Sequence, residues 1–100
     1  MTETETISWI LLAVSLGSEV ESVDYAGIKM LADGINHAIP LDKEMQRSLK
    51  WLVSNGVINK IGKKYNLSET GKELYSNASG DNRPISEIWN ELEVKIKAYT

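Results

Sequence analysis

The chain of 100 residues contains no cysteine and a single histidine, His37. It therefore lacks the side chains that form disulfides, thiolate nucleophiles and the usual zinc sites. It also has no run of about 18 apolar residues that would cross a bilayer, and its opening, MTETETIS, is acidic where a signal peptide is positively charged. We expect one soluble, cytoplasmic domain with no metal, no cofactor and no contact with a membrane.

Residues that would build a catalytic site are also scarce. The carboxylates Glu3, Glu5, Glu19 and Glu21 fall in the N-terminal segment and in a loop, without a nucleophile motif or a phosphate-binding glycine loop nearby. The sequence therefore predicts that the protein is not an enzyme.

Charge is present but unevenly distributed. The net charge of the chain is −3, yet residues 1–24 carry −5 without any basic residue, whereas residues 42–65 carry +4. The basic residues of this second stretch are Lys43, Arg47, Lys50, Lys60, Lys63 and Lys64. A basic region inside an acidic protein is typical of a local surface that faces phosphate.

The first expected helix begins after Thr4 or Thr6, either of which can cap it, and ends near Leu16. Its apolar residues lie on two opposite sides: Ile7, Ile10, Leu11 and Val14 on one, and Trp9, Leu12 and Leu16 on the other. A helix that is apolar all round needs a covering layer on each side.

A second helix is expected from Tyr25 to about Ala38, with Asp24 as its N-cap. Its apolar stripe consists of Tyr25, Ile28, Leu31, Ala32, Ile35 and Ile39. Pro40 disfavours helical geometry at the residue before it, and therefore separates this helix from the next.

The third helix is expected from Leu41 or Asp42 to Asn55, because Asn55-Gly56 is a strong C-terminal stop. Its core stripe consists of Leu41, Met45, Leu49, Leu52 and Val53. The opposite face carries Lys43, Arg47, Lys50 and Ser54, with Gln46 at its margin. This helix therefore combines an apolar face with a basic one.

Two β-like runs follow, Val57–Ile61 and Lys64–Leu67, and the turn signal Gly62-Lys63 joins them into a hairpin. Upstream, Val20 and Val23 could supply a very short strand beside this hairpin.

Ser68 is expected to cap a fourth helix that ends near Ser76, although Thr70 forms a capping box with Glu73 and is an alternative start. Gly71 would let this helix pass close to a strand, because glycine has no Cβ. The polar segment 77–83 reads as a connection to a last helix, from Pro84 to about Tyr99.

This order of elements resembles the winged helix-turn-helix domain of bacterial and archaeal transcriptional regulators. The match is closest in LKWLVSNGVINKIGKKYNLSETGKEL, where Tyr65, Leu67, Ser68, Gly71 and Leu74 occupy the positions of the motif. The resemblance implies a mostly α fold of order αααββα with a small β-hairpin wing over residues 1–76. A linker over 77–83 and an extra C-terminal helix over 84–100 would follow.

The resemblance further implies double-stranded DNA binding, with a recognition helix over 42–55 and a wing over 57–67. An α-helix fits the major groove, where Arg and Gln contact base edges while lysines reach phosphates. On this interpretation Gln46 and Arg47 contact bases, and Lys43, Lys50, Lys60, Lys63 and Lys64 contact phosphates. The alternative is that these lysines only solvate a helix face and protect an exposed hairpin edge.

The first and last helices carry further apolar residues, namely Trp9, Leu12, Leu16, Ile88, Trp89, Leu92 and Ile96. These two helices either pack on each other within one chain or pair between two chains. Apolar surface of this size favours a homodimer, since it rarely stays exposed on a monomer.

We therefore expect a homodimeric DNA-binding regulator of transcription. The alternative is a winged helix module that binds a protein partner instead of DNA, through the acidic N-terminus, Trp51 and the terminal helices.

Overall fold

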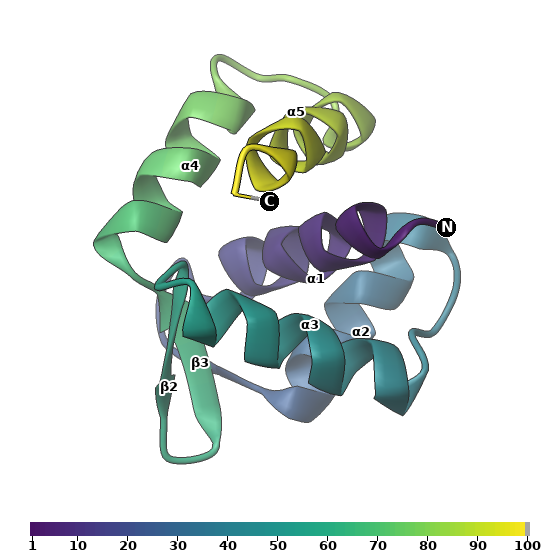
Figure 1. The fold of residues 1–100 in the computed structure, drawn as a ribbon, viewed down its shortest axis with the longest axis vertical. Coiled ribbons are helices and arrows are strands. Elements are labelled where there is room, and N and C mark those ends of the chain that lie inside the picture. The colour runs from purple at the N-terminus through teal and green to yellow at the C-terminus, as the bar shows by residue number, and fades with distance from the viewer. Residues whose placement is uncertain (100) are drawn as a thin grey trace.

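The computed structural model describes residues 1–99 and shows a mostly helical protein with a small three-stranded antiparallel sheet (Figure 1). The elements are α1 (Glu3–Gly17), β1 (Val23–Asp24), α2 (Tyr25–Asn36), α3 (Asp42–Ser54), β2 (Ile58–Ile61), β3 (Lys64–Leu67), α4 (Glu69–Ser79) and α5 (Ile85–Lys97). None of these helices has the length and hydropathy that would let it cross a membrane.

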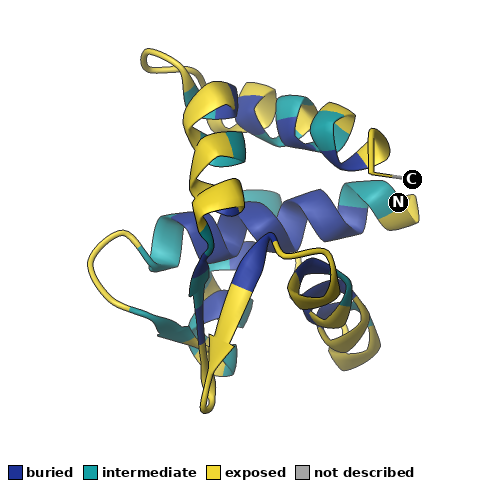
Figure 2. Ribbon diagram, turned by 60° about the vertical axis from the view of Figure 1, so that its left-hand side comes forward, coloured by how far each residue is buried: buried dark blue, intermediate teal, exposed yellow. Residues whose placement is uncertain are grey.

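Helix α1 runs through the middle of the molecule, with α4 and α5 on one side and α2 and α3 on the other (Figures 1 and 2). Trp9 and Leu12 on one of its faces and Ile10 and Val14 on the other are all buried. The expectation that this helix needs two covering layers is confirmed, and α5 of the same chain supplies the second layer.

Most helices start at a capping residue that lies next to them in the sequence. Helix α1 begins earlier than expected, because Thr2 and Glu5 form a capping box in which the Thr2 hydroxyl accepts from the Glu5 backbone. Asp24 caps α2 as expected by accepting from the Gly27 N–H at 2.8 Å. Helix α2 ends two residues before the expected Ala38, where His37 takes a left-handed conformation (φ 53°).

The sheet has the strand order β1-β3-β2, and β1 pairs with β3 through Val23 opposite Tyr65. The short strand expected near Val20 and Val23 is therefore present, but it excludes Val20, which is almost fully exposed. The hairpin turn at Gly62 (φ 61°) is confirmed.

Ser68 is the N-cap of α4, and it joins this helix to the sheet. Its hydroxyl accepts from the Gly71 N–H at 3.0 Å and also lies 2.8 Å from the carbonyl oxygen of Val57, to which it donates. A Cβ on Gly71 would collide with that same carbonyl, so the close approach expected from this glycine is confirmed. Helix α4 continues to Ser79, and the expected linker 77–83 is therefore wrong in its first three residues.

Three residues expected in apolar stripes are exposed instead, namely Ile39, Leu41 and Val53. Ile39 and Leu41 lie outside α2 and α3, in the connection around Pro40, so helical periodicity no longer directs them inward. Val53 lies in the last turn of α3, beside a surface groove.

Candidate nucleic-acid interface

Helix α3 is held by its apolar face, with Met45, Leu49 and Leu52 buried against the core. The helix ends as expected before Gly56, which takes a left-handed conformation (φ 71°). The outer face is therefore exposed, and it presents Lys43, Gln46, Arg47 and Lys50 to solvent.

The hairpin places one of its lysines toward α3. Lys60 pairs with Tyr65 across the two strands, so the two side chains lie on the same face of the sheet. The ammonium of Lys60 lies 5.9 Å from the centre of the Tyr65 ring, and Tyr65 is largely buried. Lys60 therefore extends from the core-facing side of the hairpin, beside α3.

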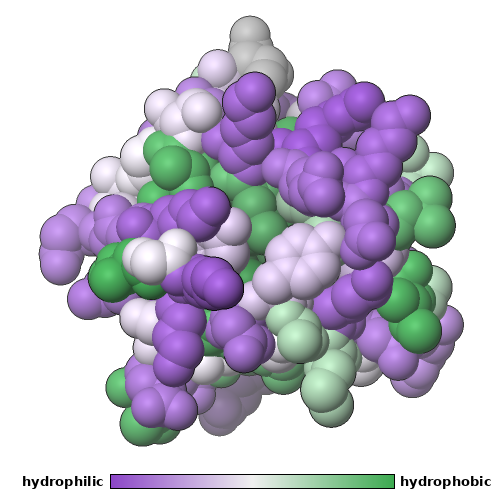
Figure 3. Space-filling view, turned by 90° about the horizontal axis from the view of Figure 1, so that it is seen from below, coloured by the Kyte–Doolittle hydropathy of each residue, from purple (hydrophilic) through white to green (hydrophobic). Residues whose placement is uncertain are grey.

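A groove of about 470 Å³ lies between these two elements, and we call it the α3–hairpin groove. Its lining consists of Tyr25, Gln46, Leu49, Lys50, Val53, Ser54, Lys60 and Tyr65. Figure 3 looks onto this side of the molecule and shows apolar surface in a hollow between hydrophilic side chains. The groove thus brings together three predicted site residues, Gln46, Lys50 and Lys60, with no carboxylate in its lining.

The other residues of the predicted helix stripe lie on the opposite flank of α3. Lys43 and Arg47 line a smaller hollow of about 160 Å³ with Glu44 and with Glu3 from the N-terminal end of α1. The predicted basic stripe therefore has two different surroundings, one without a carboxylate in its lining and one partly acidic.

The remaining two lysines of the hairpin do not reach the groove. Lys63 lies in the turn between β2 and β3, at the tip of the hairpin. Lys64 is paired in register with Asp24 of β1, and it lines a hollow that also contains Glu21 and Asp24. Lys64 therefore faces acidic residues of its own chain.

The two acidic residues of α3 are engaged in local contacts. Asp42 accepts hydrogen bonds from the Lys29 ammonium at 2.9 Å and from the Tyr25 hydroxyl at 2.8 Å. The Lys29 bond, followed by that of Tyr25, holds the pKa of Asp42 below its usual value. Glu44 folds back to accept from the Leu41 N–H at 2.9 Å and so caps the helix.

Tyr25 is a site residue that the sequence interpretation had assigned only to the core stripe of α2. Its ring lines the α3–hairpin groove while its hydroxyl binds Asp42. Burial, followed by the hydrogen bond to Asp42, raises its pKa to about 12. Only the helical spacing of Tyr25 was visible in the sequence, and this spacing does not reveal a partner 17 residues away.

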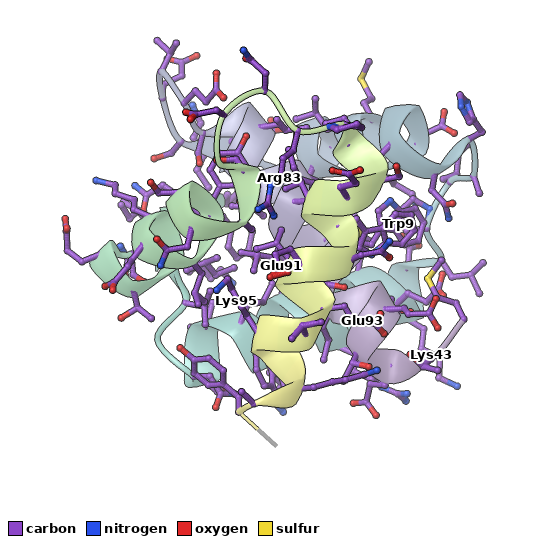
Figure 4. All side chains as sticks on the ribbon, turned by 90° about the horizontal axis from the view of Figure 1, so that it is seen from above. Trp9, Lys43, Arg83, Glu91, Glu93 and Lys95 are labelled. Atoms are coloured by element: carbon purple, nitrogen blue, oxygen red, sulfur yellow. The ribbon has the colours of Figure 1, made fainter. Side chains whose placement is uncertain are left out.

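The terminal helices pack on each other within one chain. The Trp89 indole donates to the carbonyl oxygen of Glu5 at 3.0 Å and stacks on Trp9 with 6.1 Å between ring centres. Leu12, Ile88, Leu92 and Ile96 are buried and Leu16 is half-buried. Viewed from above, Trp9 lies on the side of α5 away from α4 (Figure 4). The apolar surface that favoured a homodimer is thus already covered by the chain itself.

Across residues 1–99, no group of three or more His, Asp or Glu side chains is arranged to hold a metal ion. Comparisons with known proteins found no matching family model, no matching curated protein and no matching solved structure.

Proposed function

We propose that the protein binds double-stranded DNA in the manner of a winged helix regulator, with α3 as recognition helix and the hairpin as wing. The order α1-β1-α2-α3-β2-β3 and the small antiparallel sheet are compatible with that fold. The observation that carries the proposal is the α3–hairpin groove, which Lys50 and Lys60 both line and whose lining contains no acidic residue.

The positions of the basic residues around α3 suit a duplex. A helix that lies in the major groove has a phosphate backbone on each side. Lys43 lies on one flank of α3, while Lys50 with Lys60 lies on the other. We therefore propose phosphate contacts for Lys43, Lys50, Lys60 and Lys63. Gln46 and Arg47 remain the residues proposed to contact bases, as the sequence predicted.

The capping role of Glu44 and the pairing of Asp42 with Lys29 support the same proposal. Carboxylates at the N-terminal end of a recognition helix would repel phosphate. Here the Asp42 charge is opposed by Lys29 from α2, and Glu44 is directed to the backbone of its own helix start. Asp42 and Glu44 should therefore repel DNA phosphates less strongly than their position in the sequence indicates.

The test is an anisotropy titration of a fluorescent random-sequence duplex at several salt concentrations. Binding should weaken steeply with salt, and Lys50→Gln should reduce the slope of log K against log salt by about 1, the loss of one phosphate contact. The matched control is Lys72→Gln, because Lys72 lies on α4 and pairs with Glu69. Absence of duplex binding by the wild type at low salt would overturn the proposal.

A protein-binding module is the second candidate, and one observation favours it. The apolar side chains Met30, Ile39 and Leu41 are 76%, 65% and 66% exposed. Exposed apolar side chains mark a protein-binding surface where they lie together, and Ile39 and Leu41 flank Pro40 in the same connection. A homodimer, which would set two α3 helices about one DNA turn apart, also stays a prediction, and sedimentation at high concentration would test it.

A further inference from the structure

The α3–hairpin groove has an apolar floor that phosphate contacts do not use. This floor consists of Leu49 and Tyr65, which are 3% and 9% exposed, and of Val53, which is 37% exposed. A phosphate group gains nothing from apolar side chains, because it stays hydrated or binds polar donors. The floor is therefore a feature that DNA binding leaves unexplained.

The charged residues that line the groove favour an anionic ligand. Lys50 belongs to α3 and Lys60 to β2, so the groove is lined by one lysine from each of the two elements that form it. The lining contains no carboxylate, and Asp42, which binds the Tyr25 hydroxyl, is already paired with Lys29. An anion would therefore be attracted from both sides without a competing acid in the lining.

The size of the groove selects a small molecule. Its volume of about 470 Å³ falls within the roughly 300–1,000 Å³ of typical small-molecule sites, which are lined mainly by apolar side chains with a few polar groups. We propose that the α3–hairpin groove binds a small amphipathic anion, with an aromatic or branched apolar body on the floor and one carboxylate between Lys50 and Lys60.

Such a ligand would regulate DNA binding, and this consequence rests on the proposed function. The same two lysines would serve the carboxylate and the DNA phosphates, so the two ligands would exclude each other. The binding of the small anion itself does not depend on DNA and is tested first without it.

The first experiment titrates the isotope-labelled protein with naphthoate and follows the backbone amide signals by correlation NMR. The expected shifts are confined to residues around Gln46 to Ser54 and Lys60 to Tyr65. Naphthylmethanol, which has the same ring system without the charge, should bind at least severalfold more weakly, because it lacks the carboxylate that both lysines attract.

Three variants locate the site. Lys50→Gln and Lys60→Gln should each weaken naphthoate binding by about threefold to tenfold, the usual effect of losing one partly exposed charged partner. Val53→Ser should weaken naphthoate binding, because it replaces an apolar side chain of the floor by a hydroxyl. Lys43→Gln, on the other flank of the same helix, is the matched control and should leave naphthoate binding unchanged.

Several results would overturn the inference. These are shifts scattered over the surface, equal binding of naphthylmethanol, or unchanged naphthoate affinity in Lys50→Gln and Lys60→Gln. The inference also fails if an acidic peptide such as Glu-Leu-Glu-Trp binds the groove more tightly than naphthoate. Concentration-dependent shifts of the same signals without any probe would show a second copy in the groove instead.

The outcomes for the two proposals can be separated. If naphthoate binds as described and no duplex binds, the anion site stands and the DNA-binding proposal fails. If duplex binds with the predicted salt dependence and naphthoate does not bind, only the anion site fails. If both bind but naphthoate does not displace the duplex, the regulatory consequence is wrong.

Discussion

The indole Nε1 of Trp89 lies 3.0 Å from the carbonyl oxygen of Glu5, so the last helix is hydrogen-bonded to the first turns of α1. The Ser8 hydroxyl lies 3.2 Å from the same nitrogen, and the Trp89 ring stacks on Trp9. Trp89 and Glu5 are 84 positions apart in the chain, yet they are in direct contact. The apolar residues that α1 and α5 carry beyond one core-facing stripe are therefore used to pack these two helices together.

Replacing Trp89 by Phe should destabilise this contact within the single chain. The ring is largely retained but the donor is lost, so we expect the free energy of unfolding to fall by about 1–2 kcal/mol in urea titrations. Val94→Ala on the same helix is the control, since Val94 is exposed, and it should change stability by less than about 0.5 kcal/mol. A change in oligomeric state without a loss of stability would instead indicate a contact between chains.

Two glycines in helices should respond to alanine with opposite signs. Gly71→Ala places a Cβ against the Val57 carbonyl, and we expect a loss of about 1–3 kcal/mol, as for an overpacked core. Gly34→Ala in α2 adds a methyl that would have no atom within 4 Å apart from its chain neighbours and the backbone of its own helix, and it should gain about 0.5–1 kcal/mol from helix propensity. Urea unfolding of both variants tests the close approach of α4 to the sheet. If both variants lose the same free energy of unfolding, this close approach is contradicted.

The pH dependence of stability should include the Asp42 contact. Lys29 and Tyr25 lower its pKa in the folded protein, whereas the pKa of an Asp in an unfolded chain is about 3.9. The stabilisation is therefore fully present above the unfolded pKa and is lost as the pH falls through the folded pKa. Asp42→Asn should destabilise the protein at neutral pH, and its difference from wild type should shrink toward about pH 3.

Two comparisons test the Asp42 assignment. Because this carboxylate is exposed, added salt should reduce the effect of Asp42→Asn. Asp81→Asn is the control, since Asp81 makes no ion pair or side-chain hydrogen bond with any of the described residues 1–99. A difference between Asp42→Asn and wild type that stays constant across this pH range would contradict the assignment.

The parts of the fold that depend on short segments were predictable from the sequence. Asp24 and Ser68 cap helices, and Gly56 and Gly62 take left-handed conformations, because each of these features depends only on residues nearby in the chain. Helical periodicity likewise identified Leu49 and its neighbours as core residues of α3.

The failures concern residues whose environment is set by distant segments. Leu41 continues the spacing of the α3 stripe, but it precedes the helix and is exposed. Asp42 was expected near the helix start, yet its partners Tyr25 and Lys29 come from another helix. Whether α5 would cover its own chain or a second one could not be read from a stripe that fits both arrangements.

The lysines of the hairpin also differ in their surroundings, and this difference depends on distant segments of the chain. All three were expected to contact phosphate, but strand register places Lys60 beside α3 and Lys64 opposite Asp24. The register of β1 on β3 was not deducible from a two-residue strand, so the acidic neighbours of Lys64 were not foreseen.

This difference between the lysines leads to a matched test of the proposed DNA-binding surface. Lys60→Gln and Lys64→Gln remove the same charge from the same hairpin, but only the first removes it from the acid-free groove. Lys60→Gln should reduce the salt slope of duplex binding by about 1, and Lys64→Gln should leave the slope nearly unchanged. The measurement is the anisotropy titration at several salt concentrations. Equal reductions would mean that the whole hairpin attracts DNA through its net charge and that the groove has no special role.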